Sequence, residues 1–269
     1  MKTAFAKLCR PLFERVVFTR RLPADLGGAG IYVSPRIDAR VLRQSISEMD
    51  PDLLAAARLL VRPGKNVWDI GSNLGVFTMA ATHLTGPAGT VLAVDADAAH
   101  VEMLRRTVRR AGHSTVTPLH CGIAASVGVA RLNIVGRGKA KNFMAEAESA
   151  AAVGEVVEQH TVVTVTLDWL SAQFPAPDVV KIDIEGAELM ALQGATTLLE
   201  KVRPAIYIEV QGKNVSGANS LLRSLRYSLF EIAATGPALA PLETCAFNTV
   251  ALPEERVDEF RSSNAQRSQ

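Results

Sequence analysis

The chain has 269 residues, 48% of them hydrophobic, which is enough apolar material for one large α/β domain with additions. Its 29 basic and 27 acidic residues leave a formal net charge of +2, so no overall field points to nucleic acid or an anionic membrane. The three cysteines lie far apart without CxxC spacing, which argues against a disulfide framework and against a zinc site.

The N-terminal stretch, residues 1–23, has the pattern of a basic amphipathic helix. It carries six Lys or Arg residues against Glu14 alone, and its apolar residues recur near helical spacing. Charges interrupt every apolar run, which excludes a spanning helix and disfavours a signal peptide. The pattern is compatible with packing on the rest of the protein or on a partner, and with contact to a membrane surface by a cytoplasmic protein. With the Gly- and Pro-marked connection that follows, it forms an extension over residues 1–49.

From residue 66 onward, short apolar runs alternate with longer helical patterns, which is typical of βαβ units on a parallel sheet. Strands are expected at residues 67–70, 91–94, 116–119, 129–135, 179–183 and 206–210, and two more within 226–234 and 246–253. Helices are expected at residues 50–61, 75–84, 98–110 and 187–199. We predict one α/β domain over residues 50–261, and a frayed polar tail over 262–269.

The segment NVWDIGSNLGVFTMAA, residues 66–81, indicates a buried strand, a tight loop and an apolar helix. It lacks the GxxxxGK[ST] pattern of a phosphate-binding loop. A dinucleotide fingerprint would need glycine at positions 73 and 76, where this chain has Asn73 and Val76. We therefore expect the backbone to approach a ligand closely at Gly71 and Gly75, but not a pyrophosphate.

Two acids flank this loop. Asp69 is the last polar residue of the first strand, and a carboxylate there repels phosphate but suits a cationic ligand such as S-adenosylmethionine. Asp95 ends the second strand, where an acid can accept hydrogen bonds from both hydroxyls of a ribose. The pair favours an adenosyl amino acid over NAD.

With these residues in view, the chain resembles the FkbM-type methyltransferases, a branch of the S-adenosylmethionine-dependent Rossmann-like enzymes. The resemblance covers residues 66–209 and is carried by DIGSNLG, VDAD, KIDIEGAE, LQGA and RPAIYIE. It implies a Rossmann-like methyltransferase fold: a mostly parallel central sheet of about seven strands, the final one antiparallel, with helices on both faces. It also implies S-adenosyl-L-methionine as donor and O-methylation of a hydroxyl on a small-molecule acceptor such as a sugar, a polyketide or a lipid-like metabolite.

The resemblance also implies a set of donor-binding residues. By position they are Asp69, Gly71, Ser72, Asn73, Gly75, Asp95 and His120. Two departures from the family pattern are visible: Ala96 replaces the proline that usually follows the ribose acid, and HCGIAASVG stands where the family usually has Asn-x-Ala-x-Ser-Asp before a glycine.

The segment VVKIDIEGAELMALQGA, residues 179–195, gathers charged residues where a buried strand ends. Ligands of open parallel sheets sit outside the carboxyl ends of the strands, near the switch point, and Asp183 is placed there. We expect Asp183 to orient or deprotonate the acceptor hydroxyl, and Glu188 to complement a helix dipole. The candidate catalytic residues are Asp183, Glu185, His160 and Glu209. Clustered carboxylates are also ligands for Mg²⁺, so a base and a metal role both stay open.

Residues 136–159 lack a clean period and contain basic, amide and apolar side chains. They are expected to form either an acceptor-side lid or a surface insertion. Two other functions are compatible with the motifs: a non-catalytic adenosyl-binding interaction domain, and a nicotinamide-dependent oxidoreductase. A nucleic-acid amino-methyltransferase is disfavoured, because Asp183-Ile184-Glu185-Gly186 replaces its Asn/Asp-Pro-Pro-aromatic signature.

Overall fold

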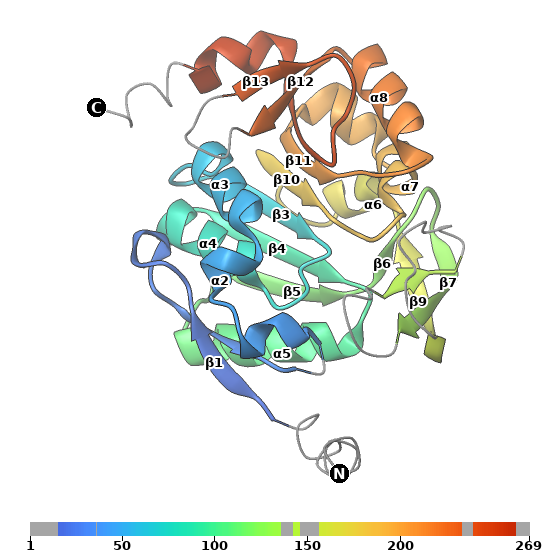
Figure 1. Cartoon of the computed structure of the whole chain (residues 1–269). Coiled ribbons are helices and arrows are strands. Elements are labelled where there is room, and N and C mark those ends of the chain that lie inside the picture. The colour runs from blue at the N-terminus through green and yellow to red at the C-terminus, as the bar shows by residue number, and fades with distance from the viewer. Residues whose placement is uncertain (1–15, 36, 136–141, 146–155, 233–238, 262–269) are drawn as a thin grey trace.

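The computed structural model describes residues 16–35, 37–135, 142–145, 156–232 and 239–261. These residues form a central eight-stranded sheet in the order β13-β12-β14-β11-β10-β3-β4-β5 (Figure 1). Its strands are β3 (Asn66–Ile70), β4 (Thr90–Asp95), β5 (Val116–His120), β10 (Val179–Ile182), β11 (Ala205–Glu209), β12 (Tyr227–Ile232), β13 (Leu239–Leu242) and β14 (Asn248–Pro253). Strands β5, β4, β3, β10 and β11 run parallel, and β14 lies antiparallel between β11 and β12. The predicted Rossmann-like methyltransferase fold is confirmed.

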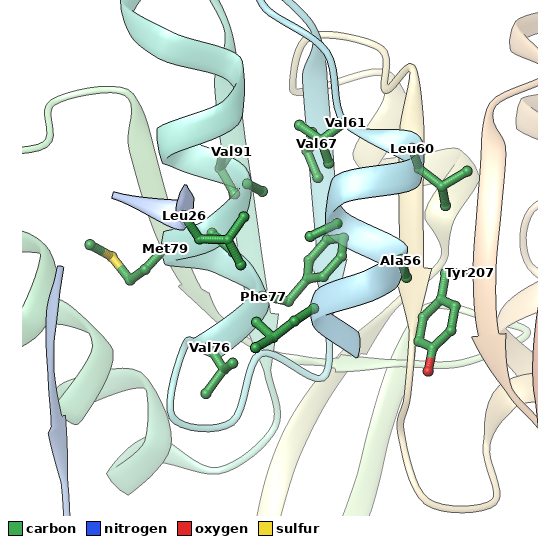
Figure 2. Close-up of a cluster of buried hydrophobic side chains, with 14 of the residues drawn as sticks. Leu26, Ala56, Leu60, Val61, Val67, Val76, Phe77, Met79, Val91 and Tyr207 are labelled. Atoms are coloured by element: carbon green, nitrogen blue, oxygen red, sulfur yellow. The ribbon is translucent and has the colours of Figure 1, made fainter. Parts of the chain in front are cut away.

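Helices cover both faces of the sheet (Figure 1). One face packs against α3 (Pro51–Leu60), α4 (Val76–Thr85) and α5 (Ala98–Ala111), and the other against α6 (Leu167–Ser171), α7 (Glu188–Gln193) and α8 (Asn214–Ser224). Each central strand alternates its side chains between two buried clusters, so that Val67 enters the first and Trp68 the second. Figure 2 shows the first cluster, in which Phe77 of α4 lies between α4 and α3.

The N-terminal part of the described chain is a hairpin. Strand β1 (Phe18–Arg21) pairs antiparallel with β2 (Gly30–Val33), so the basic helix expected over residues 1–23 does not extend through Phe18. The hairpin packs on α5, where the Tyr32 N–H donates to Thr107 Oγ1 at 3.0 Å. A short helix, α2 (Ile46–Met49), precedes α3. Residues 1–15 lie outside the described residues, and their packing or membrane role stays a prediction. No helix in the described ranges is long and apolar enough to cross a membrane.

A second, smaller sheet was not predicted as a separate unit. It has the order β6-β9-β7-β8 and consists of β6 (Gly122–Ile123), β7 (Gly128–Val135), β8 (Phe143–Met144) and β9 (Val156–Val165). The strand expected at residues 129–135 is β7, and its partner is β9, antiparallel. The sheet rises beside the carboxyl ends of the central strands (Figure 1).

The helix expected over residues 187–199 is interrupted. Helix α7 ends at Gln193, residues 194–195 form a turn, and a π-helical segment follows at Leu198–Val202. A Cβ at Gly194 would lie 2.4 Å from the Ala124 carbonyl oxygen, and the Gly194 carbonyl accepts the Asp168 N–H at 2.9 Å. Close packing against the chain near Ala124 thus accompanies the break. The tail at 262–269 lies outside the described residues.

Candidate cofactor and acceptor site

The loop after β3 folds over the end of β4. Gly71 and Ser72 both donate their N–H to the Val94 carbonyl, at 2.8 and 2.9 Å, and Asn73 donates its N–H to Asp95 Oδ2 at 2.7 Å. Gly71, Asn73 and Gly75 all have positive φ (80°, 47° and 83°), a region that suits glycine best. Gly71, Asn73 and Gly75 therefore stand at alternate positions because the loop adopts a left-handed backbone conformation at each of them.

Gly71 is required by the neighbouring strand. A Cβ at this position would lie 1.8 Å from the Asp183 carbonyl oxygen and 3.0 Å from the Ile184 side chain. In the structure this backbone closely approaches the turn after β10, and its approach to a ligand stays a prediction. The loop after β3 and the turn that carries Asp183 are consequently one packed unit.

Asp69 lies beneath the loop and is fully enclosed, with 0% exposure. Its Oδ2 accepts the Thr78 hydroxyl at 2.6 Å, and its Oδ1 lies 3.1 Å from Lys181 Nζ. This corrects the expectation that Asp69 meets a cationic ligand, because its charge is compensated within the chain. The cation is a lysine on the adjacent strand, in register with Asp69.

Lys181 was not assigned a role from the sequence, yet it joins three parts of the site. Its side chain is 3% exposed, and Nζ donates to the Gly71 carbonyl at 2.5 Å and lies 3.9 Å from Asp183 Oδ2. Burial would lower the pKa of Lys181, but the charges of Asp69 and Asp183 together raise it above its ordinary value. Nζ is therefore a fixed positive charge between the loop and Asp183.

Ser72 and Asp95 fit a polar ligand. Ser72 Oγ is buried and has no hydrogen-bond partner among the described residues, which is a costly arrangement unless a ligand or a water molecule supplies one. Asp95 is 8% exposed. The Ser72 hydroxyl lies in the loop after β3, and the Asp95 carboxylate lies at the end of the adjacent strand β4.

Two histidines flank Asp95. His120, predicted as a donor-binding residue, ends β5 in register with Asp95, is exposed, and places Nε2 3.1 Å from the Ala96 carbonyl. His100, which we did not predict, places Nδ1 3.1 Å from Asp95 Oδ1. The sequence offered one signal for this contact: His100 lies five residues after Asp95, in the first turn of the helix expected at residues 98–110.

The turn after β10 carries two of the predicted catalytic acids, Asp183 and Glu185. Asp183 is partly exposed, and its N–H donates to the Ile70 carbonyl at 3.0 Å. Glu185 has a φ of 51°, which is uncommon for a residue with a side chain. Glu188 is 2% exposed, and its carboxylate accepts the Gly186 N–H at 2.9 Å and the Ile184 N–H at 3.3 Å.

Glu188 therefore does more than complement a helix dipole, since it holds the turn through two backbone donors. Burial raises the pKa of Glu188 above its ordinary value, and the Gly186 N–H offsets only part of that. Asn214 of α8 adds a hydrogen bond to the Gly186 carbonyl at 2.8 Å. The strained backbone around Glu185 is thus held from both sides.

Glu209 ends β11 at the same edge of the sheet, and its charge contributes to the raised pKa of Lys181. His160 belongs to the second sheet: it lies on β9 opposite Leu132, and its Nε2 lies 2.7 Å from Glu158 Oε1. Asp183, Glu185 and Glu209 are therefore brought to one edge of the central sheet, whereas His160 comes from a different sheet.

The described part of the expected lid lies against this edge. Met144 of β8 is 4% exposed and belongs to a small buried cluster with Ala124 and Ala187, against which Ile184 packs. Asn142 donates its Nδ2 to Asp97 Oδ2 at 2.7 Å. The other residues of the segment, 136–141 and 146–155, lie outside the described residues, so closure over an acceptor stays a prediction.

Within the described ranges, no group of three or more His, Cys, Asp or Glu side chains is arranged to hold a metal ion. Because Mg²⁺ is commonly held by one or two carboxylates together with water and substrate oxygens, its role at the clustered acids stays a prediction.

An open, mostly parallel sheet with the antiparallel strand β14 between β11 and β12, a glycine loop after β3 and acids at the carboxyl edge define a Rossmann-like protein of the methyltransferase type. The model of the Methyltransferase FkbM domain matches residues 69–231, and the chain belongs to this family.

Individual relatives are more distant. Hexuronic acid methyltransferase AglP of Haloferax volcanii is 28% identical over 168 residues, covering 60% of this chain and 63% of AglP. The crystal structure of methyltransferase FkbM from Methylobacillus flagellatus KT has a TM-score of 0.46 and 16% identity, over 74% of this chain and 50% of that chain. A SAM-dependent methyltransferase from Aquifex aeolicus has a TM-score of 0.45 and 11% identity, over 80% of this chain and 96% of that chain. The chain thus spans less than two thirds of AglP and half of the Methylobacillus protein.

Proposed function

We propose that this chain is an S-adenosylmethionine-dependent methyltransferase that methylates a hydroxyl of a sugar or a similar small molecule. The observation that carries the proposal is the loop over residues 71–75, bent over Asp95 with a buried Ser72 hydroxyl that lacks a partner in the described chain. Membership of the FkbM family supports methyl transfer. The name of AglP, a hexuronic acid methyltransferase, supports a sugar-like acceptor.

The donor would be held by the loop after β3 and the end of β4. In this assignment Asp95 receives the ribose hydroxyls, Ser72 Oγ gains its missing hydrogen bond, and His120 lies beside the adenine end. Asp69 supports the loop from below through Lys181 and Thr78. S-adenosylmethionine held there would supply a methyl group to the acceptor oxygen, with S-adenosylhomocysteine as the leaving group.

The acceptor side is assigned to the turn after β10. Asp183 Oδ accepts a hydrogen bond from the acceptor hydroxyl and takes its proton as the oxygen reacts. Lys181 Nζ lies 3.9 Å from Asp183 Oδ2, so this buried cation helps to fix the position of the carboxylate. Glu185 and Glu209 line the same edge and are assigned to hydrogen bonds with other hydroxyls of the acceptor.

The test begins with calorimetry using S-adenosylmethionine, S-adenosylhomocysteine and NAD as separate ligands. We expect the two adenosyl amino acids to bind and NAD not to bind, and NAD binding as tight as either would contradict the proposal. Formation of S-adenosylhomocysteine is then followed with hexuronic acids, neutral hexoses and non-sugar alcohols, each with and without EDTA. Turnover that EDTA abolishes and Mg²⁺ restores would assign the acids to a metal instead of a base.

A further inference from the structure

His100 occupies the space between two acids at the proposed ribose position. It lies in the first turn of α5 with its side chain 15% exposed. Nδ1 lies 3.1 Å from Asp95 Oδ1, and Nε2 lies 3.7 Å from Asp97 Oδ2. One imidazole therefore faces two carboxylates, one with each ring nitrogen.

The two acids belong to different parts of the site. Asp95 holds the loop after β3 through the Asn73 N–H, and its Oδ1 also accepts the Asp97 N–H at 2.8 Å. Asp97 caps α5 through the Ala99 N–H at 2.7 Å and holds Asn142, next to β8, at the same distance. His100 is thus the side chain that joins the donor loop to the segment beside the acceptor turn.

Charge explains why a histidine suits this position. Burial would lower the pKa of His100, but the adjacent Asp95, and more weakly Asp97, raise it to about 9. Burial would likewise raise the pKa of Asp95, but the His100 charge and the N–H groups of Asp97 and Asn73 hold it below its ordinary value. At neutral pH an imidazolium therefore compensates two neighbouring carboxylates. The ionisable side chain facing them from β5 is His120, whose Nε2 is directed at the Ala96 carbonyl.

We propose that His100 is a positioning residue for the methyl donor, whose imidazolium fixes Asp95 to receive the ribose hydroxyls and fixes Asp97 to hold Asn142. The inference rests on the proposed function, because it takes Asp95 as the ribose acid. Loss of the imidazolium frees both carboxylates to move apart, so ribose recognition weakens while the sheet and α5 remain.

The probe is 5′-methylthioadenosine, which has both ribose hydroxyls but no amino acid, so that no group of its own titrates between pH 7 and 10. In the wild type, affinity is expected to fall as pH rises through about 9. His100→Gln is expected to bind roughly tenfold to a hundredfold more weakly at pH 7 and to lose this pH dependence. His113→Gln, the same substitution just beyond the other end of α5, is the matched control and should behave as the wild type.

If His100 only stabilised the fold, its substitution would not change how strongly the protein distinguishes ligands with and without a ribose hydroxyl. The 2′-deoxy analogue of the probe should bind more weakly than the probe itself in the wild type, and this difference should shrink in His100→Gln. Wild-type affinity that stays constant from pH 7 to 10, or equal discrimination in both proteins, overturns the inference whether or not the variant folds well. Wild-type protein that binds neither the probe nor S-adenosylhomocysteine refutes the proposed function and this inference together.

Discussion

Lys181 and Asp69 form an enclosed ion pair: Nζ lies 3.1 Å from Oδ1, and the two side chains are 3% and 0% exposed. They face each other across β10 and β3, in register. Such a pair is costly to break, because removal of one partner leaves an uncompensated charge in the interior. The pair also sets the position of the Gly71 carbonyl, which Lys181 binds.

Lys181→Met should destabilise the protein by about 3–5 kcal/mol, because Asp69 would stay buried without its cation. Urea unfolding measures the change. Lys65→Met is the matched control: it removes a partly exposed ion pair with Asp178 at the opposite end of the same two strands and should cost about 1 kcal/mol or less. Adding Asp69→Asn to Lys181→Met should recover part of the loss. If Lys181→Met and Lys65→Met lowered the free energy of unfolding equally, the enclosed pair would contribute no more to stability than the partly exposed one.

Gly71→Ala should weaken both stability and donor binding, because the new Cβ meets the Asp183 carbonyl oxygen. Gly64→Ala is the control for backbone strain: its φ of 76° is close to the 80° of Gly71, but a Cβ there meets nothing within 4 Å. The control should lose about 1–2 kcal/mol, the cost of the left-handed conformation alone. Thermal unfolding and calorimetry with S-adenosylhomocysteine compare the two. If Gly71→Ala were no worse than Gly64→Ala, the packing between loop and turn would be looser than described.

Asp183→Asn should lower turnover roughly a hundredfold or more with little change in donor affinity, since it keeps the size of the side chain but removes the charge. Asp178→Asn is its control on the same segment of chain: Asp178 binds Lys65 and the Asn66 N–H at the other end of β10, so only stability should respond. The rates require an identified acceptor. Turnover of Asp183→Asn within a few-fold of the wild type would move the catalytic assignment to Glu209 or His160.

Glu188→Gln and Glu188→Ala should separate hydrogen bonding from charge. Gln retains an acceptor for the Gly186 N–H, whereas Ala leaves that buried donor unsatisfied, at a cost of about 1–3 kcal/mol. Because the folded-state pKa of Glu188 is raised, the folded protein holds its proton more tightly than the unfolded chain does. Wild-type stability relative to Glu188→Gln should therefore fall as pH rises from the ordinary pKa of 4.5 through the raised folded-state pKa. A difference that instead grows with pH would show that the ionised form is the one the fold favours.

Much of the fold follows from local sequence pattern. The central strands are short apolar runs, since both faces of a parallel sheet are covered, and their bounds were predicted to within about one residue at most ends. Asp97 as N-cap and Gly112 as C-cap delimit α5 in the same local way. The edge strand β13 was missed, because LAPL has no strong strand pattern and forms a strand by pairing with β12.

The sequence by itself also determined the family, because the glycine loop, Asp95 and the KIDIEGAE turn are short motifs that can be recognised locally. Only the tertiary structure decided what each acid faces. Asp69 meets Lys181, which lies 112 positions away in the chain, and Gly71 meets the carbonyl of Asp183. Asp97 meets Asn142, which lies next to β8 of the second sheet. These partners are set by strand order and by packing between distant segments, so no local pattern of residues encodes them.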